Sequence, residues 1–128
     1  MELIFQSKII TMTTQEIADR FYVLAQEGKF DEIQDELYAQ DVKSIEPEGS
    51  PWPAVQGMEA IKEKSVQFNE MVEEMYSGFT DKPIVSGNTF ACRMGFDAKM
   101  KGRERGMMEE IALYQVKDGK IVSEQFFM

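Results

Sequence analysis

The spacing of hydrophobic residues changes once along the chain, and this change limits the possible folds more than any other feature. Before Gly78, apolar residues recur every three or four positions, as in helices buried on one face. After Gly78, apolar and polar residues alternate, as in half-buried strands, most clearly at Phe90, Cys92, Met94, Phe96, Ala98 and Met100. Helices followed by a run of strands predict an α+β domain, not a βαβ repeat.

Three helices are expected in the first part of the chain. Thr13 and Glu16 form a capping box that starts a helix ending at Gly28, with its apolar face at Ile17, Phe21 and Leu24. A shorter helix is expected from Asp31, with Ile33 and Leu37 buried. A third is expected from Gly57 to Gly78, with its buried face at Ile61, Ser65, Phe68, Val72 and Met75.

Strands are expected around and after these helices. Residues 41–53 predict a short strand and a loop that holds Trp52 between two prolines. Further strands are expected at 79–85, 90–100, 107–116 and 120–128, with Pro83 indicating an edge or a bulge. Gly87-Asn88 and Asp118-Gly119 have the composition of tight hairpin turns.

The last hairpin predicts which residues share a face. A two-residue Asp118-Gly119 turn pairs Lys117 with Lys120, and counting outward places Tyr114, Glu110, Gln125 and Phe127 on one face. The opposite face would then carry Ile111, Leu113, Val122, Phe126 and Met128. Both faces are apolar, so both need a cover. We expect the helices to cover the first face and a second copy of the chain to cover the other. The resulting homodimer would form through Ile111, Leu113, Val122 and Phe126. The alternative is a monomer that tolerates these side chains or covers them with residues 1–11.

Composition and charge exclude several classes of function. The chain has 128 residues, a formal net charge of −9 and a pI of about 4.5, which disfavours binding to nucleic acids or anionic membranes. It has no histidine and a single cysteine, Cys92, so an internal disulfide is excluded and a structural zinc site nearly so. Neither a dinucleotide-binding nor a P-loop motif is present. We therefore expect a cytoplasmic protein without a cofactor.

One domain is expected over residues 13–128. Residues 1–12 lack the basic leader and cleavage site of a signal peptide. They are interpreted either as an extension before a start at Met12 or as an arm that docks on a partner subunit.

Four segments resemble the nuclear-transport-factor-2-like superfamily, especially its SnoaL-like and ketosteroid-isomerase-like branches. They are residues 25–30 (AQEGKF), 45–49 (IEPEG), 57–61 (GMEAI) and 114–121 (YQVKDGKI). Their order and spacing are similar to that family over about residues 13–128. The resemblance implies a cone-shaped roll, in which about three N-terminal helices pack into a curved antiparallel sheet. It identifies function poorly, because the fold hosts isomerases, cyclases, dehydratases, hydrolases and binding proteins without activity.

The resemblance to ketosteroid isomerases assigns three positions. Glu46 matches the general-base aspartate that precedes Pro-x-Gly in that family. Phe21 matches a tyrosine of the oxyanion hole and lacks its hydroxyl, although Tyr22 is adjacent. Glu110 is the nearest match, across a gap, to a protonated aspartate that donates the second hydrogen bond. This partial match argues against ketosteroid isomerase activity itself.

Glu46 and Glu110 are the candidate catalytic residues, because a carboxyl group in an apolar hollow has a raised pKa and can exchange protons near neutrality. Glu46 could instead be a solvated loop acid, and Glu110 a buried acid with a structural role. The candidate ligand-binding residues are Phe21, Trp52, Met94, Tyr114, Gln125 and Phe127.

Three functions remain open from the sequence. The first is a pocket for a small apolar ligand, and the second is a cofactor-free isomerase, cyclase or dehydratase acting on an apolar carbonyl compound. The third is a non-catalytic dimeric interaction module.

Overall fold

The computed structural model describes residues 11–128, which form three helices and seven strands. The helices are α1 (Thr14–Gln26), α2 (Phe30–Leu37) and α3 (Met58–Met71). The strands are β1 (Tyr38–Ile45), β2 (Val55–Gln56), β3 (Val72–Thr80), β4 (Ile84–Ser86), β5 (Thr89–Met100), β6 (Gly106–Lys117) and β7 (Lys120–Phe127). This confirms the predicted α+β class. All but two residues of the proposed N-terminal extension or arm lie outside the described residues.

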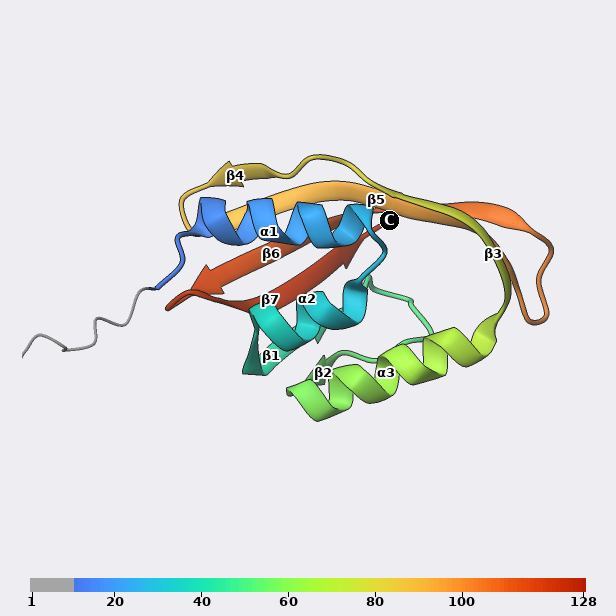
Figure 1. The fold of residues 1–128 in the computed structure, drawn as a ribbon. Coiled ribbons are helices and arrows are strands. Elements are labelled where there is room, and N and C mark those ends of the chain that lie inside the picture. Colours follow the sequence, from blue (N-terminus) through green and yellow to red (C-terminus); the bar gives the residue numbers. More distant parts are fainter. Residues whose placement is uncertain (1–10) are drawn as a thin grey trace, which may run out of the picture.

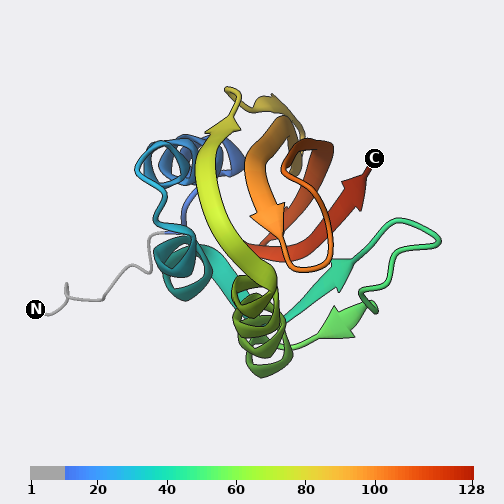
Figure 2. The same ribbon diagram turned by 90° about the vertical axis from the view of Figure 1, so that its right-hand side faces the viewer.

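The strands form one curved sheet in the order β2-β1-β7-β6-β5-β3, with β4 also paired to β5. All pairs are antiparallel except β1 with β7. Helix α3 contacts β1 and β2 at one end of this order and β3 at the other. The sheet therefore bends until both edges reach the same helix, and α1 and α2 lie within the bend (Figures 1 and 2). This is the predicted cone-shaped roll.

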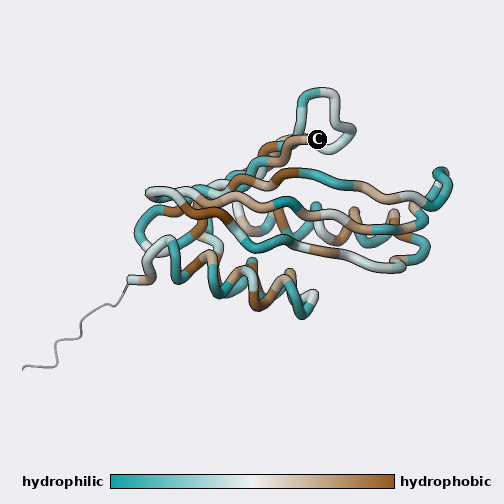
Figure 3. The backbone as a smooth tube through the Cα atoms, turned by 90° about the horizontal axis from the view of Figure 1, so that it is seen from above, coloured by the Kyte–Doolittle hydropathy of each residue, from teal (hydrophilic) through white to brown (hydrophobic). Residues whose placement is uncertain are grey.

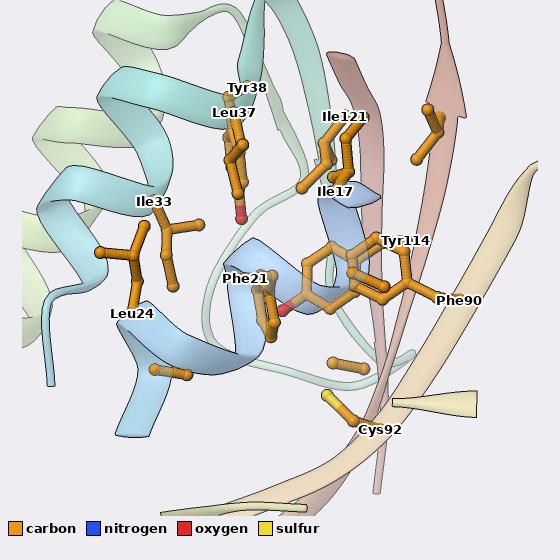
Figure 4. Packing of buried hydrophobic residues seen from close by; sticks show 14 of the residues in the cluster. Ile17, Phe21, Leu24, Ile33, Leu37, Tyr38, Phe90, Cys92, Tyr114 and Ile121 are labelled. Carbon is orange, nitrogen blue, oxygen red and sulfur yellow. The ribbon is translucent and has the colours of Figure 1, made fainter. Parts of the chain in front are cut away.

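Helix α1 forms as its sequence predicts. The Thr13 hydroxyl accepts a hydrogen bond from the Glu16 amide at 3.1 Å, and the Glu16 carboxylate accepts one from the Thr13 amide at 2.8 Å. Apolar stretches recur along the turns of this helix and along the strands behind it (Figure 3). Ile17, Phe21 and Leu24 are fully buried, and the Phe21 ring faces Tyr114 and Phe90 from the sheet (Figure 4).

The predicted boundaries of the second and third helices need correction. Asp31 was expected to be the N-cap of the second helix, but the N-cap of α2 is Lys29, two residues earlier, and the helix begins at Phe30. Helix α3 ends at Met71, and Val72 to Thr80 pair with β5 instead of continuing the helix. The apolar spacing of this segment suits either structure, and pairing with a strand distant in the sequence decides the outcome.

The last hairpin turns as predicted and then departs from the predicted register. Asp118 and Gly119 both have positive φ, 51° and 76°, as a tight two-residue hairpin turn requires, and Lys117 pairs with Lys120. A bulge follows between Gln115 and Val116, so that Gln115 lies opposite Ser123.

A one-residue shift moves each later side chain of β7 to the other face of the sheet. Tyr114 therefore pairs with Glu124 and not with Ser123, and Phe126 pairs with Ala112. The predicted inward placement of Gln125 and Phe127 is wrong, and so is the placement of Phe126 on the outer face. The outer face still exposes large apolar side chains at Met107, Ile111 and Phe127, and Met128, predicted for the same face, is exposed just beyond the end of β7.

Among residues 11–128, no helix is long and apolar enough to cross a membrane.

Candidate functional site

A cavity of about 200 Å³ lies between the helices and the concave face of the sheet. Helices α1 and α2 supply one wall, and strands β5, β6 and β7 supply the other. The apolar part of the lining consists of Phe21, Phe30, Ile33, Tyr38, Met94, Tyr114 and Phe126. The polar part consists of Gln34, Glu110 and Glu124. Five of these ten side chains are aromatic, so the cavity is a mostly apolar chamber, half of it aromatic, with a few polar groups.

The deep wall of the cavity is rigid. The Phe21 ring centroid lies 4.8 Å from that of Tyr114 and 5.4 Å from that of Phe90. Phe90 and Tyr114 stack at 4.9 Å, and all three residues are at most 2% exposed (Figure 4). Interlocked rings of this kind hold their positions, because any displacement would open a void in the core. Phe30, by contrast, is 46% exposed and lies where the cavity meets the surface.

Glu124 is a buried carboxyl group held by two hydroxyl groups. Parallel pairing of β1 with β7 places Ser44 opposite Glu124, and the Ser44 hydroxyl donates to Glu124 Oε2 at 2.6 Å. The Tyr38 hydroxyl donates to Glu124 Oε1. Burial raises the pKa of Glu124, and these two hydrogen bonds act in the opposite direction.

Lys64 connects this pair to Glu46. Its ammonium group, on α3, donates to Ser44 Oγ at 2.8 Å and to Glu46 Oε2 at 2.6 Å. The Lys64 and Glu46 side chains are only 17% and 14% exposed. A continuous set of hydrogen bonds therefore runs from Glu46 through Lys64 and Ser44 to Glu124.

Glu110 is the cavity carboxyl group without such partners. It lies on β6 opposite Met94, and no side chain among residues 11–128 forms a hydrogen bond or ion pair with it. Burial, followed by the charges of Glu46 and Glu124, raises its pKa to about 7, while Lys64 opposes the rise. Both protonation states of Glu110 are therefore populated near neutral pH.

Gln34 supplies a second unpartnered acceptor. Its Nε2 donates to Ser65 Oγ at 3.2 Å, but its Oε1 is buried and has no donor within the described part of the chain. A buried carbonyl oxygen without a donor costs free energy that a bound hydrogen-bond donor would recover.

The structure brings together some of the predicted site residues and separates others. Phe21, Met94, Glu110 and Tyr114 line the cavity. Glu46 lies beside it, in the ion pair with Lys64. Three predicted ligand-binding residues do not line it, namely Trp52, Gln125 and Phe127. Trp52 lies in the loop after β1, and the other two face outward because of the bulge.

Several residues of the site were missed in the sequence analysis. They are Phe30, Ile33, Gln34, Tyr38, Ser44, Lys64, Glu124 and Phe126. One signal was present: Ser44 follows Val42 at the two-residue spacing of a strand and so shares its buried face. Glu124 was hidden, because regular counting from the turn places it on the outer face.

No cluster of acidic or cysteine side chains over residues 11–128 is arranged to hold a metal ion. Cys92 is buried, and burial raises its pKa to about 12, so the thiol stays protonated and weakly nucleophilic.

Comparison with known proteins places the whole domain in context. Residues 12–128 match the family model described as a SnoaL-like domain. A crystal structure from Mesorhizobium loti, described as that of a candidate SnoaL-like polyketide cyclase and also labelled carbohydrate phosphatase, is 36% identical. The match covers 91% of this chain and 100% of that one, with a TM-score of 0.86.

More distant structures share the fold. An NTF2-like protein of unknown function from Burkholderia pseudomallei is 16% identical, with a TM-score of 0.73 and coverage of 91% of this chain and 92% of that one. TerC, co-crystallised with polyporic acid, is 16% identical, with a TM-score of 0.71 and coverage of 90% of each chain. A search of curated proteins found no match.

Proposed function

The chain belongs to the SnoaL-like domain family, and on that basis we propose that it binds a small, largely apolar molecule in the cavity beneath α1 and α2. The observation that carries this proposal is a cavity, half of whose lining is aromatic, with two acceptors that no side chain within residues 11–128 donates to, the Glu110 carboxyl group and Gln34 Oε1. Binding sites for small molecules are typically apolar hollows with a few polar groups that fix orientation. The crystals of TerC with polyporic acid support the proposal, since they place an organic compound with a protein of this fold.

The methionines allow a direct test by NMR of methyl-labelled protein. Met94 lines the cavity, whereas Met107 is 57% exposed on the outer face. We expect small cyclic compounds to shift the Met94 methyl signal in a saturable way and to leave that of Met107 unchanged. The variant Met94→Trp should fill the cavity and abolish binding, as followed by the methyl signals of Ile33, which also lines the cavity, and Met107→Trp is the matched control. A compound library that shifts no cavity methyl would contradict the proposal.

A second candidate function is acid–base catalysis, favoured by the protonation behaviour of Glu110. A carboxyl group with a pKa of about 7 beside an apolar cavity can both accept and donate a proton at neutral pH. The similarity to a candidate polyketide cyclase is consistent with such chemistry. In this second proposal Glu110 is the catalytic group. Glu46 is a positioning residue, since its carboxylate is bound to Lys64 and its charge raises the pKa of Glu110.

Proton abstraction by Glu110 can be tested without the natural substrate. The probe 5-nitrobenzisoxazole loses its ring C–H proton to a base as its N–O bond breaks, and the phenolate product absorbs visible light. We expect a rate that rises with pH and levels off above about 7, and that falls at least about 100-fold in Glu110→Gln. Glu109→Gln, one residue away on the outer face, is the matched control. An unchanged rate in Glu110→Gln would exclude the catalytic role.

We also propose that the outer face of β6 joins two copies of the chain. Met107 and Ile111 are exposed there, and Leu113 lies on the same face, whereas Phe126 is excluded from it by the bulge. An exposed apolar strand face favours association through a second copy. Light scattering should report a dimer for the native chain and a monomer for Ile111→Lys. A monomeric native chain would contradict the proposal.

A further inference from the structure

Two polar groups of the cavity, Gln34 Oε1 and the carboxyl group of Glu110, are free hydrogen-bond acceptors when Glu110 is ionised. Gln34 Oε1 has no donor within residues 11–128, and its amide nitrogen is already bound to Ser65. Over the same residues, no side chain donates to the Glu110 carboxylate. The hydroxyl groups of Tyr38 and Ser44 both donate to Glu124, whereas no side chain among residues 11–128 is bound to the hydroxyl group of Tyr114, which also lines the cavity. A ligand that satisfies both Gln34 Oε1 and the Glu110 carboxylate must therefore supply donors, and the Tyr114 hydroxyl group can accept from such a ligand as well.

The charges around the cavity are predominantly negative. Three carboxyl groups, Glu46, Glu110 and Glu124, act on the same region, against one ammonium group, that of Lys64. Lys64 is already engaged by Glu46 and Ser44. An anionic ligand would add to the repulsion among the carboxylates, whereas a cation would relieve it.

The aromatic lining also favours a positively charged ligand. Aromatic rings attract a cation placed over their faces within about 6 Å of the centroid. The Lys64 ammonium already lies 5.8 Å from the Phe126 ring centroid in this arrangement. Because the cavity is small and half of its lining is aromatic, a bound cation lies close to several rings at once.

We propose that the ligand of this cavity is a small protonated amine with an apolar frame. Its N–H groups donate to Gln34 Oε1 and to the Glu110 carboxylate, and its frame packs against the aromatic lining. This inference rests on the proposed binding function and narrows it to one chemical class.

Three probes that share a cyclohexyl ring and differ mainly in charge test the inference. Cyclohexylamine remains a cation at neutral pH, because alkylammonium groups have pKa values near 10. Cyclohexanol is its neutral analogue and cyclohexanecarboxylate its anionic analogue. We expect cyclohexylammonium to bind about tenfold or more tightly than cyclohexanol at pH 8, as measured by the Met94 methyl shift.

The dependence on pH identifies the carboxyl group that is involved. The groups that act on Glu110 are Glu46, Glu124 and Lys64, and it lies near Cys92 and Tyr114. If only ionised Glu110 binds the amine, affinity should rise about tenfold from pH 6 to pH 8, one unit either side of its pKa of about 7. In Glu110→Gln the rise should disappear. Glu109→Gln should behave as the native protein, and an unchanged methyl spectrum verifies the fold of each variant.

The possible outcomes separate this inference from the broader proposal. Equal or tighter binding of cyclohexanol at the Met94 site would overturn the amine inference and leave the small-molecule function standing. A pH dependence that persists in Glu110→Gln would also overturn it. If neither these probes nor a wider set of compounds shifts the Met94 signal, both proposals fail.

Discussion

The hydroxyl group of Ser44 donates a hydrogen bond of 2.6 Å to the carboxyl group of Glu124, a residue 80 positions later in the chain. The two residues lie directly opposite in the parallel pair formed by β1 and β7. Ser44 also accepts from Lys64 at 2.8 Å, so one buried hydroxyl group joins a buried acid to the ion pair beside the cavity. The polar arrangement around the cavity depends on this junction.

Replacing Ser44 by alanine should destabilise the fold. The change leaves one oxygen of Glu124 without its donor in a site that is 0% exposed at Ser44 and 6% at Glu124. A buried acceptor that loses its partner costs about 1–3 kcal/mol, which urea unfolding can measure. Ser86→Ala, at an exposed strand position, is the control and should change the free energy of unfolding by less than about 0.5 kcal/mol. Equal stabilities for the two variants would show that the hydrogen bond is not needed.

Ionisation of Glu110 should lower stability as the pH rises. Its folded pKa of about 7 lies above the ordinary value of 4.5, so its contribution is complete below about 4.5 and is lost as the pH rises through about 7. Between pH 5 and pH 8 this loss is about 2 kcal/mol of unfolding free energy.

The variant Glu110→Gln should reduce this pH-dependent loss, whereas Glu109→Gln should retain it. Urea unfolding at both pH values provides the comparison. The other acids, including Glu124 with its raised pKa, contribute equally to all three proteins. A native protein and a Glu110→Gln variant with the same pH dependence would contradict the predicted ionisation.

Lys64 should hold down the pKa of Glu110. Its positive charge favours the ionised form of this carboxyl group, against the opposing charges of Glu46 and Glu124. In Lys64→Met we therefore expect the pKa of Glu110 to rise above about 7, as followed by carbon NMR of the side-chain carboxyl. Lys62→Met is the control, since Lys62 pairs with Asp35 and does not act on Glu110. A fall in the pKa, or equal shifts in both variants, would refute this explanation.

Gly95 should tolerate no side chain. A Cβ atom at this position would lie 2.3 Å from the carbonyl oxygen of Met108 and 2.9 Å from the Phe79 ring. Gly95→Ala should therefore cost about 1–3 kcal/mol in unfolding free energy, or more where the paired strand cannot move. Gly106 offers a matched control in the same sheet, because a Cβ there meets nothing within 4 Å. A melting temperature for Gly95→Ala equal to that of Gly106→Ala would show that the strands adjust without cost.

The sequence alone determined the features that depend on neighbouring residues. The capping box of Thr13 and Glu16, the Asp118-Gly119 turn and the alternation along β5 each depend on a few adjacent positions, and all three formed as predicted. The α+β class followed from the same short-range patterns. The inward placement of Glu110, Tyr114 and Met94 also followed from strand alternation and a short count from the turn.

The tertiary structure decided the features that depend on contacts between distant segments. Pairing with β5 made a strand of Val72–Thr80. The bulge between Gln115 and Val116 shifted the register of β7, so that Glu124 and Phe126 lie on the inner face in place of Gln125 and Phe127. The parallel alignment of β1 with β7 then placed Ser44 against Glu124, and α3 brought Lys64 to both Ser44 and Glu46. Register and strand order are set by the total packing of the sheet against the helices. A local pattern carries no information about a one-residue shift whose stabilising contacts lie tens of residues away.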